Sequence, residues 1–192
     1  MNLSLTKKEL RTIYKEKRMA LSQDEVNFLS QKILDQFILQ FNIIENQKVN
    51  IFLSIEKLKE VNTQIFIDYF FENKIRVFVP KIQGENMISV EIFPNSEFEI
   101  NNWGIKEPIS NIDANVEFDY VLTPLLYCDQ FGNRVGYGKG FYDSFFSRDL
   151  KIHKKIALNF FSPNEGIADV FQKDVALDGL ITPSEYIDFT VK

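Results

Sequence analysis

Short apolar runs, rich in β-branched and aromatic residues, recur along this chain, and segments of helical periodicity separate them. The runs that we predict to be strands are residues 49–54, 75–80, 88–93, 120–128, 155–160 and 179–182. Pro124 interrupts the fourth run. Strands that alternate with helices form a largely parallel sheet, because parallel neighbours need a long crossover connection. The alternation therefore predicts an α/β fold.

Two predicted helices precede the first strand, and each has a recognisable start. Thr6 is followed by Glu9, which matches the capping box, in which both side chains bond to exposed backbone amides of the first turn. Ser22 and Glu25 repeat the pattern. Further helices are predicted at residues 63–71 and 141–148. Since the chain has no internal repeat and no Pro-, Gly- or Ser-rich linker, we expect residues 1–192 to form a single-domain, three-layer (Rossmann-like) fold with helices flanking the sheet.

The composition excludes several kinds of site. Among 192 residues the chain has one cysteine, Cys128, and one histidine, His153, which excludes a disulfide framework, cysteine-based zinc sites and multi-histidine metal centres. The net charge of −5 argues against a general binder of nucleic acid or membrane surfaces. No apolar run approaches the ~20 residues of a membrane span, and the first residues do not resemble a secretion signal. We expect a cytoplasmic monomer, and a small anionic ligand remains compatible with local positive charge.

Glycines are concentrated in one segment, GNRVGYGKGFYD at residues 132–143, which contains Gly132, Gly136, Gly138 and Gly140. Alternating glycines let a backbone approach a ligand closely and turn its amides toward an anion. The spacing matches neither the Walker A loop nor the Gly-x-Gly-x-x-Gly dinucleotide motif. A flexible hairpin loop is the alternative, but the interleaved Arg134, Lys139 and Asp143 favour a phosphate site, with the aspartate placed to share a Mg²⁺ with the phosphates.

This segment, preceded by FDYVLTP at 118–124, resembles the characteristic motif of the 5-formyltetrahydrofolate cyclo-ligase (5,10-methenyltetrahydrofolate synthetase) family. Other parts of the family pattern follow in order. They are Lys7 and Arg11, FLS at 52–54, EVNT at 60–63, VPK at 79–81, WGIKEP at 103–108 and LDGLIT at 177–182. Three features depart from the pattern. Phe141 stands where tyrosine is frequent, Ser144 stands where arginine is common, and Glu60 follows Ser54 by six positions, a longer spacing than in some family members.

The resemblance implies an ATP- and Mg²⁺-dependent ligase that closes 5-formyltetrahydrofolate into 5,10-methenyltetrahydrofolate and releases ADP and phosphate. Phosphorylation of the formyl oxygen would create a leaving group, and N10 would then attack the activated carbon. Such phosphoryl transfer needs positioning and charge neutralisation rather than a covalent protein nucleophile. The scarcity of histidine and cysteine is compatible with this chemistry.

The resemblance also implies a role for each site residue. Catalysis is implied for Arg134, Lys139 and Tyr142. ATP binding is implied for Lys7, Arg11, Arg134, Val135, Gly136, Tyr137, Gly138, Lys139, Gly140, Phe141 and Tyr142. Folate binding is implied for Leu53, Glu60, Trp103, Tyr137, Gly138, Lys139, Gly140 and Phe141. The implied Mg²⁺ ligands are Asp143 and Asp178.

Some interpretations stay open at this point. A phosphate loop could instead serve a sugar-phosphate isomerase with Glu60 as its base, or a folate- or nucleotide-binding module without turnover. Lys7 and Arg11, four residues apart on one helix face, favour a triphosphate because they add charge beyond the needs of one phosphate. Trp103 could stack on the ligand or pack in the core, and the Tyr142 hydroxyl could bond to a ligand or merely pack.

Overall fold

The computed structural model describes residues 4–101, 105–148 and 150–191. The α-helices are α1 (Lys7–Met19), α2 (Gln23–Gln40), α3 (Gln64–Glu72) and α4 (Phe141–Phe146), and η1 (Glu56–Leu58) is a 3₁₀ turn. The strands of the main sheet are β2 (Lys48–Ile51), β3 (Arg76–Gln83), β4 (Asn86–Ile92), β7 (Phe118–Pro124), β10 (Ile152–Leu158), β12 (Gly179–Ile181) and β13 (Tyr186–Asp188). The shorter strands are β1 (Ser4–Leu5), β5 (Phe98–Ile100), β6 (Lys106–Pro108), β8 (Tyr127–Cys128), β9 (Arg134–Val135) and β11 (Gly166–Ile167).

The seven strands of the main sheet lie in the order β13-β12-β10-β7-β2-β3-β4. The five central strands are mutually parallel, whereas β13 and β4 pair antiparallel at the two edges. The predicted α/β fold with a largely parallel sheet is confirmed. From the central pair β2 and β7 the chain adds β3 on one side and β10 and β12 on the other, so the direction of winding reverses between β2 and β7.

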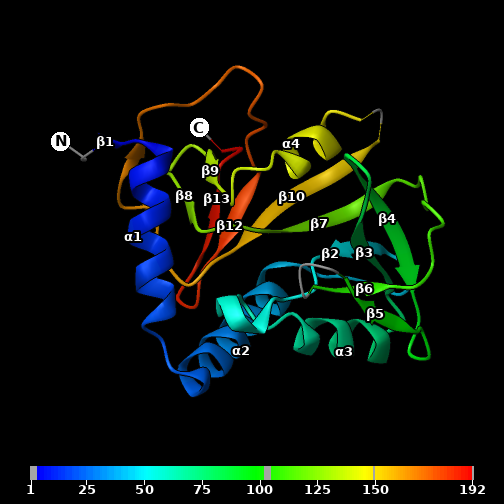
Figure 1. The fold of residues 1–192 in the computed structure, drawn as a ribbon. Helices are drawn as coiled ribbons and strands as arrows, with labels where there is room; N and C mark the ends of the chain where they lie inside the picture. Colours follow the sequence, from blue (N-terminus) through cyan, green and yellow to red (C-terminus); the bar gives the residue numbers. More distant parts are fainter. Residues whose placement is uncertain (1–3, 102–104, 149, 192) are drawn as a thin grey trace.

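This reversal explains how the helices are distributed. Crossovers between parallel strands are right-handed, so crossovers that run in opposite directions place their helices on opposite faces. The helix α3 connects β2 to β3 and lies on the same face as α2, while α4 connects β7 to β10 and lies on the other face (Figure 1). The two outer layers are unequal, because the second face carries the short α4 together with irregular segments.

Side chains alternate between the two faces along each strand. Val49, Ile51, Val77 and Val79 point to the main core under α2 and α3, which also contains Phe37, Phe66 and Phe70. Phe78 and Val121 point to the opposite face, where Phe145 of α4 covers them. Each central strand is thus buried on both sides, which is why the strands read as continuous apolar runs.

The two predicted capping boxes are confirmed. The Thr6 side chain accepts a hydrogen bond from the Glu9 amide, and the Glu9 carboxylate accepts one from the Thr6 amide; Ser22 and Glu25 do the same at α2. Leu10 and Tyr14 on the buried face of α1 pack against Tyr127 and Val135 of the β8–β9 hairpin. This packing holds α1 beside the segment that follows β9. Among the helices of the described ranges, none combines the length and the apolar character that crossing a membrane requires.

Candidate active site

A cavity of about 910 Å³ opens at the carboxyl ends of the central strands. Phe52 and Leu53 directly follow β2, Pro124 ends β7, and Ile82 lies near the end of β3, and all four line the cavity. The winding of the sheet reverses between β2 and β7. Ligands of open α/β sheets bind at such a reversal, because the connections leaving the strands diverge there and leave a crevice.

The glycine-rich loop at residues 136–140 forms one wall of this cavity. Gly138 has a φ of +87°, a conformation that side chains rarely adopt, and a Cβ there would lie 3.4 Å from a terminal nitrogen of Arg11. Gly140, with a φ of +73°, precedes the first residue of α4. Arg11 reaches the loop from α1 and donates from Nε to the Gly136 carbonyl at 2.9 Å.

Cations gather on the side of the cavity next to this loop. Lys7, Lys8 and Arg11 come from α1, Arg134 from β9, and Lys139 from the loop itself. The side chain of Arg134 is only 8% exposed, while Lys139 is exposed and has no ion pair within the described part of the chain. The positive charge predicted at this site is therefore concentrated by tertiary packing, although the protein as a whole carries a net charge of −5.

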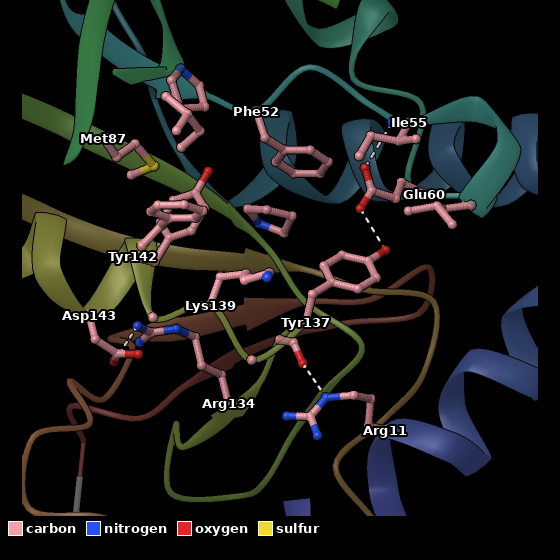
Figure 2. Close-up of a pocket in the computed structure, with 18 of the residues that line it drawn as sticks. Arg11, Phe52, Ile55, Glu60, Met87, Arg134, Tyr137, Lys139, Tyr142 and Asp143 are labelled. Carbon is pink, nitrogen blue, oxygen red and sulfur yellow. Dashed lines mark hydrogen bonds and ion pairs between the residues drawn. The ribbon is translucent and has the colours of Figure 1, made fainter. Parts of the chain in front are cut away.

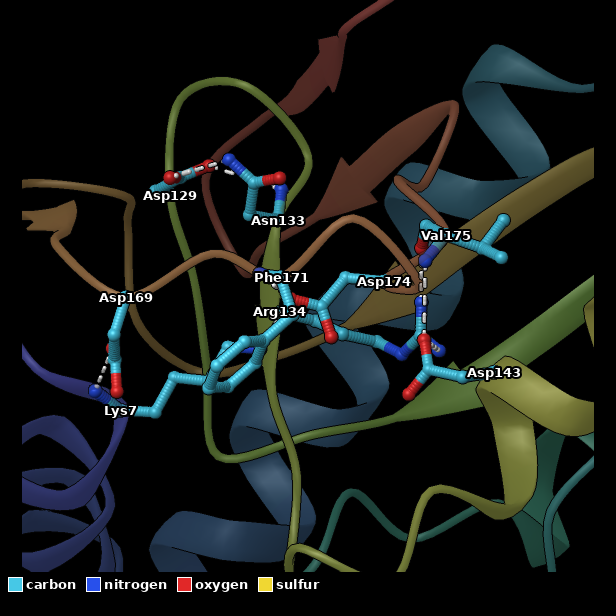
Figure 3. A network of polar contacts seen from close by, with 9 residues as sticks. All are labelled: Lys7, Asp129, Asn133, Arg134, Asp143, Asp169, Phe171, Asp174 and Val175. Carbon is cyan, nitrogen blue, oxygen red and sulfur yellow. Dashed lines mark hydrogen bonds and ion pairs between the residues drawn. The ribbon is translucent and has the colours of Figure 1, made fainter.

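Carboxylates hold two of these cations in place (Figure 3). The ammonium of Lys7 lies 2.5 Å from a carboxylate oxygen of Asp174, and its backbone amide donates to Asp169 at 2.6 Å. Arg134 pairs with Asp143 at 2.5 Å and also donates to the carbonyl of Val175. These contacts connect α1, β9 and α4 to the segment between β11 and β12.

Asp143 lines the cavity as predicted, but Asp178 does not. The Asp178 carboxylate accepts a hydrogen bond from the Lys155 amide at 2.7 Å and lies 3.3 Å from the Lys155 ammonium. It therefore extends the pairing of β10 with β12, and the structure does not bring it into the cavity with Asp143. In the described ranges, no three His, Cys, Asp or Glu side chains are grouped so that they could hold a metal by themselves.

The other half of the cavity is mainly apolar. Its wall is formed by residues that follow β2, by the end of β3, and by the starts of β4 and α4. These residues are Phe52, Leu53, Ile55, Leu58, Pro80, Ile82, Met87, Phe141 and Tyr142. The Tyr142 hydroxyl is buried and has no hydrogen-bond partner among the described residues, and burial raises its pKa, so the phenol stays protonated near neutral pH.

Glu60 is a buried carboxylate on the cavity wall, with 5% of the residue exposed. One oxygen accepts a hydrogen bond from the Ile55 amide at 2.8 Å, and the other accepts one from the Tyr137 hydroxyl at 2.9 Å (Figure 2). Burial raises the pKa of Glu60, while the Ile55 amide, the positive charge of Arg18 and the Tyr137 hydroxyl act in the opposite direction. The two hydrogen bonds thus give the buried carboxylate a fixed orientation at the cavity wall.

Tyr137 connects the two halves of the cavity, because it belongs to the glycine-rich loop and bonds to Glu60. In Figure 2, Arg134 and Asp143 lie on one side and Tyr137 and Glu60 on the other, with Lys139 between them. One cavity therefore presents cations and loop amides at one end and an apolar slot with a carboxylate at the other. This arrangement fits a phosphorylated ligand next to a planar, polar-edged ring.

The structure places most of the predicted site residues together, since Lys7, Arg11, Leu53, Glu60, Arg134 and residues 136–143 all line the cavity. Val135 is an exception: its side chain is fully buried in the core beside Tyr14, and its carbonyl accepts a hydrogen bond from the Leu126 amide. Trp103 lies outside the described residues. Three residues near the site were not predicted from the sequence. Asp169 and Asp174 contact Lys7 of α1 although they lie more than 160 residues later in the chain. Arg18 donates to the Tyr137 hydroxyl but does not line the cavity itself.

Comparison with known proteins identifies one family. Residues 4–177 match the sequence model of the 5-formyltetrahydrofolate cyclo-ligase family. The mouse 5-formyltetrahydrofolate cyclo-ligase is 31% identical over 169 residues, covering 81% of this chain and 80% of the mouse chain. The corresponding enzyme of Mycoplasma pneumoniae is 30% identical over 182 residues, covering 92% of this chain and 98% of that one.

Among solved structures, the 5,10-methenyltetrahydrofolate synthetase of Aquifex aeolicus superposes with a TM-score of 0.81. The two chains are 25% identical, and the superposition covers 98% of this chain and 95% of the other. The similarity thus extends over the sheet, the helices and the segments that form the cavity. It agrees with the resemblance read from the glycine-rich segment.

Proposed function

This chain belongs to the 5-formyltetrahydrofolate cyclo-ligase family, and from this premise we propose that it converts 5-formyltetrahydrofolate and ATP into 5,10-methenyltetrahydrofolate, ADP and phosphate. The observation that carries the proposal is the division of one cavity into a cationic half and an apolar half with a buried carboxylate. The glycine-rich loop lies at the junction, where a γ-phosphate and a formyl group would have to meet.

The cationic half supports the assignment of ATP. Lys7, Lys8, Arg11, Arg134 and Lys139 outnumber the carboxylates Asp143, Asp169 and Asp174 that line the same half, so it keeps an excess of positive charge, and the glycine-rich loop lies beside them. Arg134 is fixed by Asp143 and by the Val175 carbonyl, so its guanidinium is pre-organised before a ligand binds. Charges held in this way stabilise a transferring phosphoryl group without reorganising during the reaction.

The apolar half supports the assignment of the folate ring. A pterin is flat and presents neighbouring N–H groups at its edge, and a carboxylate accepts two such hydrogen bonds at once. Glu60 is placed for this role among the apolar side chains of Phe52, Leu53 and Ile55. Hydrogen bonds to a charged acceptor contribute about 1.5–3 kcal/mol each, so this contact would dominate recognition of the ring.

The proposed reaction has two steps. The formyl oxygen attacks the γ-phosphorus and the bond to ADP breaks, which leaves a phosphorylated formyl group. N10 then attacks the formyl carbon and loses its proton, and the carbon–oxygen bond breaks to release phosphate. Lys139 and Arg134 would neutralise the transferring phosphoryl group, and the Tyr142 hydroxyl would donate to an oxygen of the reacting groups, since it has no partner among the described residues.

The residues present also fit Mg²⁺ shared with the nucleotide. Protein sites for Mg²⁺ associated with ATP use one or two carboxylates, and phosphates and water supply the other ligands. One oxygen of Asp143 accepts hydrogen bonds from Arg134 and the Val175 amide, which leaves the second oxygen available at the cavity wall. Asp143 would hold the ion, which supplies charge neutralisation of the triphosphate when bound.

An absorbance assay tests the proposal. The purified protein is incubated with 5-formyltetrahydrofolate, ATP and Mg²⁺, and the conjugated methenyl product is followed together with ADP. We expect absorbance to rise only when all three are present, with one ADP formed per product. Binding of both ligands without turnover would instead assign the chain to a binding module, and turnover of a sugar phosphate without ATP would assign an isomerase.

A further inference from the structure

Arg18 is a buried arginine that does not line the cavity, and its surroundings connect it to the substrate-binding carboxylate. It lies on α1, about two turns beyond Arg11, and only 4% of the residue is exposed. One terminal nitrogen donates to the Leu125 carbonyl at 3.3 Å, and the other donates to the Tyr137 hydroxyl. A small chamber of about 10 Å³ is lined by both Arg18 and Glu60.

The direction of the hydrogen bonds is determined by Arg18, because a guanidinium has only donors. The Tyr137 oxygen accepts from Arg18, so the hydroxyl proton is available for Glu60, which lies 2.9 Å away. A hydroxyl that accepts from a cation becomes a stronger donor, since hydrogen bonds in a chain polarise one another. The positive charge of Arg18 is thereby transmitted to the Glu60 carboxylate through Tyr137.

We propose that Arg18 is a positioning residue for substrate recognition: through the Tyr137 hydroxyl it holds the Glu60 carboxylate in the orientation and charge state that accept the N–H groups of the folate ring. The inference rests on the proposed function of the cavity. It also gives α1 two functions, because Lys7 and Arg11 serve the nucleotide end while Arg18 serves the folate end. Arg11 and Arg18 hold adjacent residues of the loop, Gly136 and Tyr137.

Fold stability alone does not account for this arginine. The Nε of Arg18 is buried and has no hydrogen-bond partner among the described residues, so part of the desolvation cost of the guanidinium is not recovered. A buried ion pair is often replaceable by apolar side chains without loss of stability. A role in recognition therefore explains the buried charge better than a role in packing.

The test compares Arg18→Met, Arg18→Lys and Tyr137→Phe with the wild-type protein, using calorimetry to measure 5-formyltetrahydrofolate and ATP binding separately. Arg18→Met should weaken folate binding about tenfold or more, since it removes a charge-assisted contact, and should change ATP binding less than about twofold. Arg18→Lys should recover part of the loss because it restores the charge. Arg76→Met is the control, because Arg76 pairs with Glu91 outside the cavity wall.

Measuring folate binding as a function of pH adds a second test, because a purely structural role of Arg18 would leave this pH dependence unchanged. The groups that face Glu60 are Arg18 from α1, Tyr137 from the loop and Tyr142 from α4, together with the Ile55 amide. Loss of Arg18 removes the cation that lowers the pKa of Glu60, so folate binding by Arg18→Met should require a higher pH than in the wild type. An unchanged pH profile, or equal weakening of folate and ATP, would overturn the assignment.

Tyr137→Phe keeps the test decisive if Arg18→Met does not fold. Tyr137→Phe alone should weaken folate binding more than ATP binding. Where Arg18→Met does fold, combining it with Tyr137→Phe should add little, because both changes interrupt one hydrogen-bond chain. Additive effects, or unimpaired folate binding by Tyr137→Phe, would contradict the proposal. Failure of the wild-type protein to bind or convert 5-formyltetrahydrofolate would instead overturn the proposed function, and the two failures are thus distinguished.

Discussion

Lys139 differs from Lys7 and Arg134 in its surroundings. Asp174 faces Lys7 and Asp143 faces Arg134, whereas the ammonium of Lys139 has no ion pair within the described part of the chain. The long side chain of Lys139 lies beside the backbone amides of the loop, so its ammonium could change position together with a phosphoryl group that is being transferred. Its positive charge is therefore available to a ligand without breaking an ion pair to any of the described residues.

Lys139→Ala should reduce kcat/KM for ATP by about 10–100-fold, because it removes a charge-assisted bond of about 1.5–3 kcal/mol. The dissociation constant of 5-formyltetrahydrofolate should change by less than about threefold. Steady-state kinetics and calorimetry measure both. Lys151→Ala is the matched control, since Lys151 is exposed and pairs with Glu117 away from the cavity. Equal losses for both ligands would contradict the assigned role of Lys139.

Glu60 illustrates how a site residue can reduce stability. Burial raises its pKa above the ordinary value of 4.5, so the folded protein retains a proton that the unfolded chain has lost. The contribution of Glu60 to the free energy of unfolding therefore decreases as the pH rises from about 4.5 through the pKa that Glu60 has in the folded state.

Glu60→Gln removes this titration, so the stability of the wild type relative to the variant should fall across that pH range and level off above it. Urea unfolding of both proteins from pH 4.5 upward measures the difference. The variant should also lose affinity for 5-formyltetrahydrofolate. Parallel pH dependence in the two proteins would show that the Glu60 carboxyl titrates as an exposed group does.

At the scale of elements, the β8–β9 hairpin and α1 act together to place the cations. Leu10 and Tyr14 pack α1 on the hairpin, and the Tyr14 hydroxyl donates to Glu165 at 2.5 Å. The hairpin turn is organised by Asp129, whose carboxylate accepts from the Phe131 and Asn133 amides. Arg134 follows this turn directly, so its position depends on the turn conformation.

Gly132 lies in this turn with a φ of +80°, and a Cβ there would lie 2.5 Å from the Leu177 carbonyl oxygen. Gly132→Ala should destabilise the protein by about 1–2 kcal/mol for the left-handed backbone and by a further ~1–3 kcal/mol for the displaced neighbour. It should also lower kcat by displacing Arg134. Chemical unfolding and the absorbance assay measure the two effects.

Gly84→Ala is the control, because Gly84 has a φ of +62° in the β3–β4 turn, but a Cβ added there would meet no heavy atom within 4 Å. This variant should show only the backbone cost and unchanged kcat. Equal stability of Gly132→Ala and Gly84→Ala would contradict the prediction, because it would mean that the close contact between Gly132 and Leu177 does not restrict the hairpin.

For the whole molecule, the cavity brings together segments that are far apart in the chain. Residues from α1, the connection after β2, the β3–β4 pair, the glycine-rich loop and the segment 169–174 all line it. A ligand that contacts several of these segments binds the folded state and not the unfolded chain. Binding is therefore coupled to global stability.

ATP with Mg²⁺ at about 100 times the dissociation constant should stabilise the fold by about 2.7 kcal/mol, which raises Tm by roughly 5–10 °C for a chain of this size. Removal of Mg²⁺ by a chelator should reduce the shift. In Asp143→Asn the chelator should make little further difference, because the carboxylate that we assign to the ion is absent. Thermal unfolding with and without chelator measures both effects. A Mg²⁺ dependence identical in variant and wild type would assign Asp143 a purely structural role.

Local features of the fold could be read from the sequence because their causes are local. The capping boxes at Thr6 and Ser22 depend on residues three apart, and the central strands depend on runs that are buried on both faces. The antiparallel edges and the β5–β6 pair were not predicted, because their pairing partners are selected by the order of the sheet. The resemblance to the family was carried by the glycine-rich segment, which is continuous in the sequence.

The position of each side chain relative to the cavity was decided by the tertiary structure. Asp178 and Asp143 are both aspartates within the predicted motifs, yet Asp178 pairs with Lys155 in the sheet while Asp143 faces the cavity. Arg18, Asp169 and Asp174 carry no local pattern, and they reach Tyr137 and Lys7 only because α1 packs beside the loops that leave the sheet.

The sequence by itself thus determined the α/β layout and the position of the glycine-rich loop, since hydrophobic periodicity and glycine spacing act over a few residues. Only the folded chain decided which charges meet, because contacts between residues far apart in the chain depend on strand order and helix packing. The pairing of Arg18 with Tyr137, 119 residues later, is such a contact, and no pattern around either residue indicates it.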